Sequence, residues 1–373
     1  MNEMQKLFDE VDYNTIAKGL HDRRNIIYGA GDRGRMLLER LKSKNVNIFA
    51  FYDDDVTRQG STFCGKKIIT ERELGVQNIE QTNLLISSMY IPIIAKQAKE
   101  RGFVHIYADI NGLMEQDDNE FRFSEYSDNQ EYISKLHVCR DLFREERSRE
   151  YFNIVERSVL SGHASREICD IYLDEPQYFL NVFSDILNEC AFVDAGAYTG
   201  DTIREMTGQG IKPSKCYCFE ADIDNYVRLV EYIQSAGMDN IIAEHMALWD
   251  KEMELGIVNK NYNASVGDNC FERKVQSTTI NRYFEKANIG FVKMDIEGAE
   301  RYALAGGMRV IKRDRPILAI SIYHSLLDMV DIPRMLVENL ENYDFIIRHY
   351  SYTYSETIMY GVPREKGLSI YED

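Results

Sequence analysis

The chain of 373 residues lacks any apolar run of about 18 residues, the length that a membrane-spanning helix requires. Its first residues also lack the apolar core of a signal peptide, because charge begins at Glu3. We therefore expect a cytoplasmic protein that has no membrane partner.

Positive charge is scarce. There are 44 Lys and Arg residues against 61 Asp and Glu residues, which gives a net charge of −17. Nucleic acids and anionic membranes attract basic surfaces, so we expect neither as a partner. A small anionic substrate held by a local cluster is compatible with this balance, and so is a homo-oligomer. The length allows two or three domains.

Cysteine is also too scattered to build a framework. The seven cysteines are odd in number and follow neither a disulfide nor a zinc spacing. Cys216 and Cys218 alternate along a predicted strand and so face the same side. We interpret them as two small buried side chains and not as a metal pair.

Residues 1–112 are predicted to form a small Rossmann-like α/β domain. A short strand at 25–28 is followed by a glycine turn, a helix at 35–44 and a second strand at 48–52 that ends in acidic residues. The turn follows the pattern G-x-G-x-x-G, with an acid 24 residues after the first glycine. The candidate nucleotide-binding residues of this unit are Gly29, Gly31, Arg33, Gly34 and Asp53.

Two interpretations of this N-terminal unit stay open. In the first, the glycines admit a phosphate to the helix start and Asp53 accepts hydrogen bonds from ribose hydroxyls. In the second, the domain serves only packing or assembly. The unit resembles the Rossmann-like domains at the front of bacterial sugar-modifying transferases, in which a nucleotide or nucleotide-sugar commonly lies at the glycine turn.

Residues 113–175 are predicted to be a linker and a helical segment. Residues 113–130 are polar, whereas 129–161 carry apolar residues along one helical face. A shorter helix is expected at 176–187.

Residues 176–373 are predicted to form the main domain. From residue 191 onward, strands and helices alternate in five steps and end in an antiparallel pair with a turn near Tyr352. This order predicts an α/β fold with a seven-stranded, doubly wound, Rossmann-like sheet. Residues 252–280 are expected to be an inserted β segment. The expected strands of the main sheet are 192–195, 215–219, 241–245, 291–294, 317–322, 345–349 and 356–360.

Ligands of such sheets bind at the carboxyl ends of the central strands. The strand at 192–195 carries Asp194 and enters a glycine turn that opens a helix, so backbone and free N–H groups face a ligand there. Glu220 ends the next strand, where an acid fits the 2′ and 3′ hydroxyls of a ribose. Tyr198 stands where a phosphate-binding loop would have glycine, which favours S-adenosylmethionine over a dinucleotide. The candidate cofactor-binding residues are Asp194, Gly196, Ala197, Tyr198, Thr199, Gly200, Asp201, Thr202, Glu220, Ala221, Ala247, Leu248 and Asp295.

Four segments together resemble the FkbM family of S-adenosylmethionine-dependent methyltransferases. The most specific is Lys-x-Asp-Ile-Glu-Gly-Ala-Glu at 293–300, and the others are 192–202, 219–221 and 316–324. The resemblance covers roughly residues 150–362. It implies a methyltransferase sheet, S-adenosylmethionine as the cofactor, and methyl transfer to hydroxyl oxygens of sugars or other small metabolites.

Transfer to a hydroxyl needs a base that takes the proton, or a metal that lowers the pKa of the hydroxyl. Asp295 is the first candidate for the catalytic group, and Glu297 and His324 are the next. Lys293 alternates onto the side of Asp295 and is expected to pair with it. Asp295 and His324 offer only two ligands, too few to predict a metal, so we expect none.

Each catalytic candidate also has a structural interpretation. Glu297 and Glu300 fall in the first turn of a helix, where acids stabilise the helix dipole. His324 is equally compatible with a structural role. An aromatic and basic group in the C-terminal part is interpreted either as a surface on which a sugar stacks or as ordinary hairpin residues; its members are Tyr323, His324, Arg348, His349, Tyr350, Tyr352 and Tyr354.

These patterns predict an S-adenosylmethionine-dependent methyltransferase that acts on a hydroxyl of a small acceptor, a sugar or nucleotide-sugar. One alternative is an oxidoreductase or epimerase that binds NAD or a nucleotide-sugar in the N-terminal domain, although no Tyr-x-x-x-Lys pair is placed for such chemistry. The other is a non-catalytic binding protein with the same fold.

Overall fold

The computed structural model describes residues 19–88, 90–108, 129–161, 166–260, 263–267, 273–368 and 370–371. It divides into two compact units. Unit 1 comprises residues 1–128, 154–174 and 351–355, and unit 2 comprises 129–153, 175–350 and 356–373. The predicted linker at 113–130 lies outside the described residues except for its last two positions. Within the described ranges, no helix is long and apolar enough to cross a membrane.

Unit 1 contains a six-stranded sheet in the order β3-β4-β2-β1-β5-β6. The strand–turn–helix–strand prediction is confirmed, and the order reverses at β1, the strand before the glycine turn. The short antiparallel pair of β3 and β4 was not predicted, because two to four residues are too few to show a period. The strands are β1 (Arg24–Tyr28), β2 (Ile48–Tyr52), β3 (Thr62–Phe63), β4 (Lys66–Ile69), β5 (Thr82–Ile86) and β6 (His105–Ala108), and the helices are α2 (Asp32–Ser43), α3 (Glu71–Gly75), η2 (Ile79–Gln81) and α4 (Ile91–Glu100).

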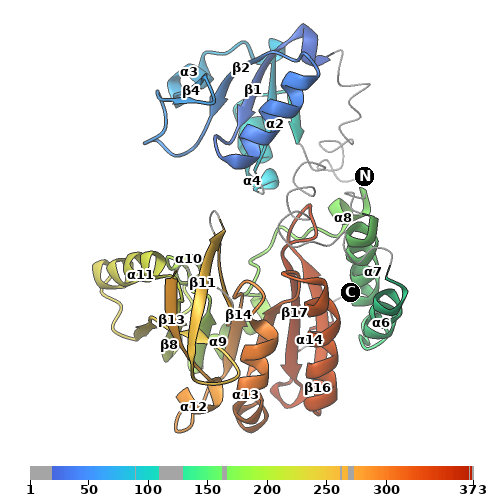
Figure 1. Cartoon of the computed structure of the whole chain (residues 1–373), viewed down its shortest axis with the longest axis vertical. Helices are drawn as coiled ribbons and strands as arrows, with labels where there is room; N and C mark the ends of the chain where they lie inside the picture. The colour runs from blue at the N-terminus through green and yellow to red at the C-terminus, as the bar shows by residue number, and fades with distance from the viewer. Residues whose placement is uncertain are drawn as a thin grey trace. The chain divides into compact units, whose positions relative to one another are not determined.

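Unit 2 contains the predicted seven-stranded sheet, in the order β16-β17-β15-β14-β7-β8-β9 (Figure 1). All neighbours are parallel except β17, which is antiparallel to both β15 and β16. The order reverses between β7 and β14, so the carboxyl ends of these two strands define the ligand crevice. The strands are β7 (Ala191–Ala195), β8 (Lys215–Phe219), β9 (Ile241–Glu244), β14 (Phe291–Met294), β15 (Ile317–Ser321), β16 (Tyr343–His349) and β17 (Thr357–Pro363).

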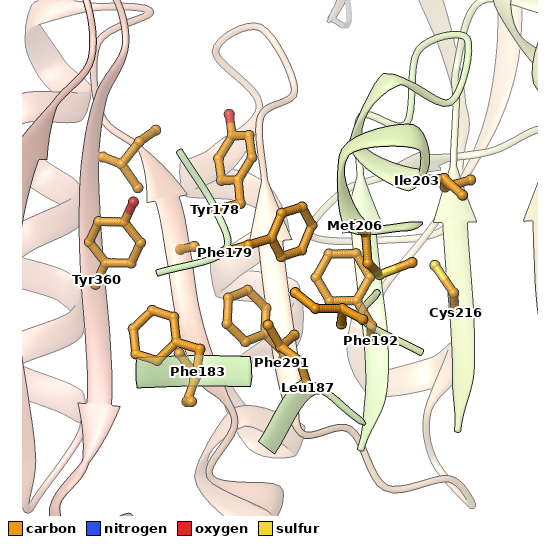
Figure 2. Close-up of a cluster of buried hydrophobic side chains, with 14 of the residues drawn as sticks. Tyr178, Phe179, Phe183, Leu187, Phe192, Ile203, Met206, Cys216, Phe291 and Tyr360 are labelled. Carbon is orange, nitrogen blue, oxygen red and sulfur yellow. The ribbon is translucent and has the colours of Figure 1, made fainter. Parts of the chain in front are cut away.

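The central strands are buried along their whole length, as a sheet covered on both faces requires. Phe192 and Phe291 lie on one face, against the segment at 176–189 that supplies Phe179 and Phe183 (Figure 2). That segment is non-helical up to Leu180. It forms η4 (Asn181–Phe183) and α9 (Ser184–Glu189), so the helix expected at 176–187 begins later than predicted.

The expected helical segment at 129–161 is two helices, α6 (Gln130–Arg140) and α7 (Glu146–Ser161). The chain turns between them around the buried side chain of Phe143. The remaining helical elements are α8 (Arg166–Asp170), α10 (Asp201–Gly208), α11 (Ile223–Ser235), α12 (Ile280–Tyr283), α13 (Glu300–Asp314), α14 (Leu326–Asn339) and η5 (Arg364–Lys366).

The inserted β segment is confirmed. Two strands, 253–258 and 275–280, are expected within it, and the described residues form a third, β12, and pair with β10 outside it. Its four-stranded sheet has the order β10-β13-β11-β12. The strands are β10 (Ala247–Leu248), β11 (Glu254–Lys260), β12 (Asn263–Gly267) and β13 (Arg273–Thr278).

Candidate active site

The glycine turn after β7 passes directly against the end of β14. Gly196 has a φ of 81°, and a Cβ atom there would lie 1.8 Å from the carbonyl oxygen of Asp295. A side chain therefore has no room at this position. Gly200, with a φ of 89°, is the N-cap of α10, and no side chain caps that helix. The N–H groups of the first turn, at Asp201 and Thr202, are thus left for a ligand.

Asp194 and Lys293 form a buried ion pair below this turn. They face each other in the register of β7 and β14, and Lys293 Nζ lies 3.0 Å from Asp194 Oδ1. Lys293 also donates to the carbonyl oxygen of Gly196, at 2.6 Å. The expected ion pair of Lys293 with Asp295 is wrong, because the strand register places the ammonium group against Asp194, although the charge of Lys293 does lower the pKa of Asp295. Burial raises the pKa of Asp194 to about 6 although Lys293 opposes the shift. Asp194 thus supports the turn from beneath.

Glu220 closes the other side of the turn. Its carboxylate accepts hydrogen bonds from the backbone N–H groups of Tyr198, at 2.8 Å, and Asp222, at 2.9 Å. Burial raises the pKa of Glu220 to about 7, against the effect of these two donors. Because a carboxylate has about four acceptor positions, Glu220 can still accept from ribose hydroxyls.

The structure also places the predicted apolar residues of the cofactor site. Ala247 lies in one cluster with Trp249 and Ala299, and Ala221 and Ile296 pack against it. Among the other predicted residues, Leu248, Ala197 and Thr202 are buried, Thr199 is half-buried, and Tyr198 and Asp201 are exposed.

Asp295 follows β14, and its carboxylate contacts two tyrosine hydroxyls and the imidazole of His324. Its Oδ2 accepts from the hydroxyl of Tyr178, at 2.9 Å, and its Oδ1 from that of Tyr323, at 3.3 Å. The Tyr178 hydroxyl points away from the phenylalanine cluster (Figure 2). Burial would raise the pKa of Asp295, but the hydrogen bond and the charge of His324 outweigh it and hold the pKa well below its usual range. The Asp295 side chain is 21% exposed and remains within reach of a ligand.

His324 follows β15 and lies between three carboxylates. Its Nε2 is 3.1 Å from Asp295 Oδ1 and 3.4 Å from Glu297 Oε2, and its Nδ1 is 3.0 Å from Glu300 Oε1. Burial opposes the charged imidazole, but the surrounding carboxylates prevail and raise the pKa of His324. The three predicted catalytic residues, Asp295, Glu297 and His324, are thus brought together.

Sequence reasoning missed Glu356 as a site residue. Glu356 precedes β17 and accepts from Gln177 Nε2, at 2.6 Å. Its carboxylate also lies 3.3 Å from the hydroxyl of Tyr323, whose single proton can be donated either to Glu356 or to Asp295. Burial and the charge of Asp295 raise the pKa of Glu356 to about 7. The sequence does contain a signal for it: an antiparallel strand begins at the edge where its parallel neighbours end.

Backbone strain gathers at this same edge of the sheet. Tyr198, Glu297 and Glu356 have φ values of 47°, 57° and 60°. Residues other than glycine rarely adopt such values, and they cluster at functional sites.

The aromatic and basic group of the C-terminal part is buried structure and offers no surface on which a sugar could stack. Arg348 Nη1 and Nη2 bind Glu145 at 2.7 and 2.9 Å, and His349 Nδ1 lies 2.9 Å from the hydroxyl of Thr357. Tyr350 is half-buried, and its hydroxyl lies 2.7 Å from that of Tyr360. Tyr323 and His324 are the members that belong to the site.

In unit 1 the predicted nucleotide-binding residues also come together. Gly29 has a φ of 109°, and Gly34 packs so closely that a Cβ atom would lie 2.1 Å from the Gly29 carbonyl oxygen. Asp53 Oδ2 accepts from the backbone N–H of Ala30 at 2.8 Å and pairs with Arg58 at 3.5 Å. The acid expected on a ribose is therefore engaged by its own turn. Gly31 is the N-cap of α2, whose second residue is Arg33.

Comparison with known proteins assigns the chemistry of unit 2. The methyltransferase FkbM domain matches residues 194–353, and a C2185-like N-terminal domain matches residues 21–105. The chain is therefore an S-adenosylmethionine-dependent methyltransferase. Within that class its residues 194–353 form an FkbM methyltransferase domain, as the resemblance implied.

One solved structure supports this fold, and two others are similar over about half of the chain. The methyltransferase FkbM from Methylobacillus flagellatus KT has a TM-score of 0.57 at 19% identity, over 93% of this chain and 92% of that chain. An rRNA methylase from Streptococcus thermophilus has a TM-score of 0.33 at 14% identity, over 48% of this chain and 90% of that one. A putative methyltransferase from Streptococcus mutans, solved with SAH, has a TM-score of 0.31 at 10% identity, over 48% and 93%. No curated protein matches the chain.

The residues of unit 2 fit S-adenosylmethionine. Glu220 faces the turn with acceptor capacity for a ribose, and the uncapped start of α10 suits a carboxylate. The close approach of Gly196 to Asp295 brings the turn beside the acidic cluster.

Proposed function

We propose that the chain methylates a hydroxyl oxygen of a small acceptor, a sugar or a nucleotide-sugar. The observation that supports this best is the position of Asp295 after β14. Its backbone carbonyl oxygen lies against Gly196 of the cofactor turn, and its carboxylate is ionised. A hydroxyl that donates to Asp295 would have its oxygen beside the cofactor site.

Bound S-adenosylmethionine supplies an electrophilic methyl group. Transfer of that methyl group to a hydroxyl oxygen would require a residue of the site to take up the hydroxyl proton. The low pKa of Asp295 makes it an orienting acceptor of a hydrogen bond and a weak final base. The hydroxyl of Tyr323 lies 3.3 Å from both Asp295 and Glu356, so it links the acceptor to a carboxylate whose pKa of about 7 suits proton uptake.

The experiment is a tritiated-methyl assay against free sugars, nucleotide-sugars and cell-surface glycans, with the position of the label determined in the product. Asp295→Asn should lower methyl transfer by about a hundredfold or more, with S-adenosylhomocysteine affinity little changed. Asp224→Asn, an exposed acid at the start of α11, is the matched control and should behave as wild type. Label on nitrogen or carbon, or full activity of Asp295→Asn, would contradict the proposal.

A further inference from the structure

We propose that Asp295, Glu297 and His324 bind a divalent cation at the carboxyl ends of β14 and β15. The three side chains each offer one ligand atom, and these atoms all lie within 4.8 Å of one another. The proposal goes beyond the methyl transfer, because it concerns a bound ion whose presence does not depend on which acceptor is methylated.

The spacing of the donor atoms suits a common metal ion. Nε2 of His324 lies 3.1 Å from Asp295 Oδ1 and 3.4 Å from Glu297 Oε2. Two ligands that are each about 2.0–2.2 Å from a metal, at a right angle, lie about 3 Å apart. The two carboxylates therefore reach the imidazole nitrogen at the separation that shared coordination requires.

Glu300 orients the histidine for this role. Its carboxylate accepts from the backbone N–H groups of Ile296, at 2.7 Å, and Gly298, at 3.0 Å, and it lies 3.0 Å from His324 Nδ1. A carboxylate that accepts from two donors keeps Nδ1 the protonated nitrogen of the imidazole. In the ion-free site Nε2 also carries a proton and lies 3.1 Å from Asp295, so a cation would bind there by displacing the Nε2 proton. A carboxylate on the far nitrogen of a metal-binding histidine is the usual supporting arrangement.

The balance of charge points the same way. Four carboxylates, from Asp295, Glu297, Glu300 and Glu356, gather around one imidazole, and three of them lie within 3.4 Å of it. Lys293 offsets this charge only in part, because its ammonium group is bound to Asp194 and to the carbonyl oxygen of Gly196. Clustered carboxylates in a half-buried site repel one another, and a divalent cation would offset that repulsion.

The donor set also indicates the class of ion. Two carboxylate oxygens and one imidazole nitrogen suit Mn²⁺, Fe²⁺ or Zn²⁺ better than Mg²⁺, which prefers oxygen ligands alone. Three protein ligands leave further positions open on the ion. An acceptor hydroxyl bound there would lose its proton more readily.

The test is a Mn²⁺ titration of the full, chelator-treated chain, followed by the electron paramagnetic resonance signal of free Mn²⁺. One saturable site is expected. Glu297→Gln and His324→Gln should each weaken it at least tenfold. Glu297→Gln is the safer variant for folding, because its side chain is 25% exposed, whereas that of His324 is 1% exposed.

Asp224→Asn serves as the matched control. This variant also removes one of two neighbouring carboxylates. Asp224 and Asp222 both form ion pairs with Arg273, so they are not expected to bind a cation. The control should keep the wild-type affinity and so separates the site from weak binding of Mn²⁺ to an acidic surface. Absence of a saturable site in the wild type, or equal affinity of wild type and Glu297→Gln, would overturn the proposal.

The two proposals fail separately. Binding of Mn²⁺ with no product labelled on oxygen would remove the proposed function and leave the cation site. Labelled hydroxyl product without saturable Mn²⁺ binding would remove only the cation site.

Discussion

At the scale of single residues, the site contains positions where a neighbour distant in the sequence decides which residue type fits. Gly196 is the clearest case, because the carbonyl oxygen of Asp295 occupies the place of its missing Cβ. A positive φ alone only favours glycine over other residues. This contact excludes them, because any Cβ atom at position 196 would clash with the Asp295 carbonyl oxygen.

Gly196→Ala should therefore cost more than its backbone conformation explains. We expect a loss of about 3 kcal/mol or more in unfolding free energy, together with loss of cofactor binding. Gly210→Ala is the matched control. Its φ of 75° is similar to the 81° of Gly196, but nothing lies within 4 Å of its added Cβ, so about 1 kcal/mol is expected. Chemical denaturation of both variants measures the difference, and equal losses would contradict the role of the contact.

Glu220 predicts a dependence of stability on pH. Its pKa is raised to about 7 in the folded chain from 4.5, so its contribution is fully present below pH 4.5 and is lost as the pH rises through 7. A shift of this size corresponds to about 3 kcal/mol at most. Glu220→Gln should remove this loss, so the stability of the variant relative to wild type should rise between pH 5 and 8. Unfolding midpoints measured without cofactor test the slope, and parallel pH profiles would contradict it.

At the scale of elements, the connection between α6 and α7 and the first turn of α7 protect an edge of the sheet. Strand β16 is the outermost strand, and its Ile347 donates its backbone N–H to the hydroxyl of Ser148, at 2.9 Å. Beside it, Arg348 and Glu145 form a buried pair with two hydrogen bonds of 2.7 and 2.9 Å. The turn between the two helices, together with the first turn of α7, thus satisfies groups that an exposed edge strand would present to other chains.

Breaking this pair should destabilise unit 2 strongly. Glu145→Ala or Arg348→Ala alone leaves a buried charge without its partner, and we expect a loss of about 3–5 kcal/mol. The double variant should lose less than the sum of the two, which a double-mutant cycle in urea measures. Arg282→Ala, which breaks a pair that is 67% and 50% exposed, is the control and should change little. Additive losses would show that the pair does not interact.

Sequence patterns predicted the helices and strands better than the contacts between side chains of different strands. Strands such as β14 and β15 were found because buried apolar runs end at Asp295 and near His324. The predicted ion-pair partner of Lys293 was wrong, since that partner depends on the register between two strands whose contact at Gly196 joins residues 97 apart. Glu356 was missed for a similar reason: its place in the site depends on the direction of β17 within the sheet.

At the scale of the whole molecule, the two units have separate cores. One cluster around Phe192 and Phe291 lies in unit 2, and two others, around Ile26 and Ile27, lie in unit 1. A ligand that binds one unit should therefore protect mainly that unit.

S-adenosylhomocysteine should slow hydrogen exchange in peptides that span 194–202 and 219–222, and leave those within 24–108 unchanged. At a hundred times its dissociation constant, it should stabilise unit 2 by about 2.7 kcal/mol. NAD and nucleotide-sugars are the matched probes for unit 1, where protection of residues 29–34 would support the predicted nucleotide site. Protection of 24–108 by S-adenosylhomocysteine would contradict the assignment of the cofactor to unit 2.

The placement of β17 between β15 and β16 has a consequence for biosynthesis. The chain leaves the ribosome with its N-terminus in front. Both β15 and β16 are therefore made before β17 (357–363), the strand that pairs with each of them. Glu356 arrives with it, so neither the sheet nor the acidic cluster can be completed while this segment is still inside the ribosome. The catalytic unit should thus acquire its native structure only after residues 357–363 have left the ribosome.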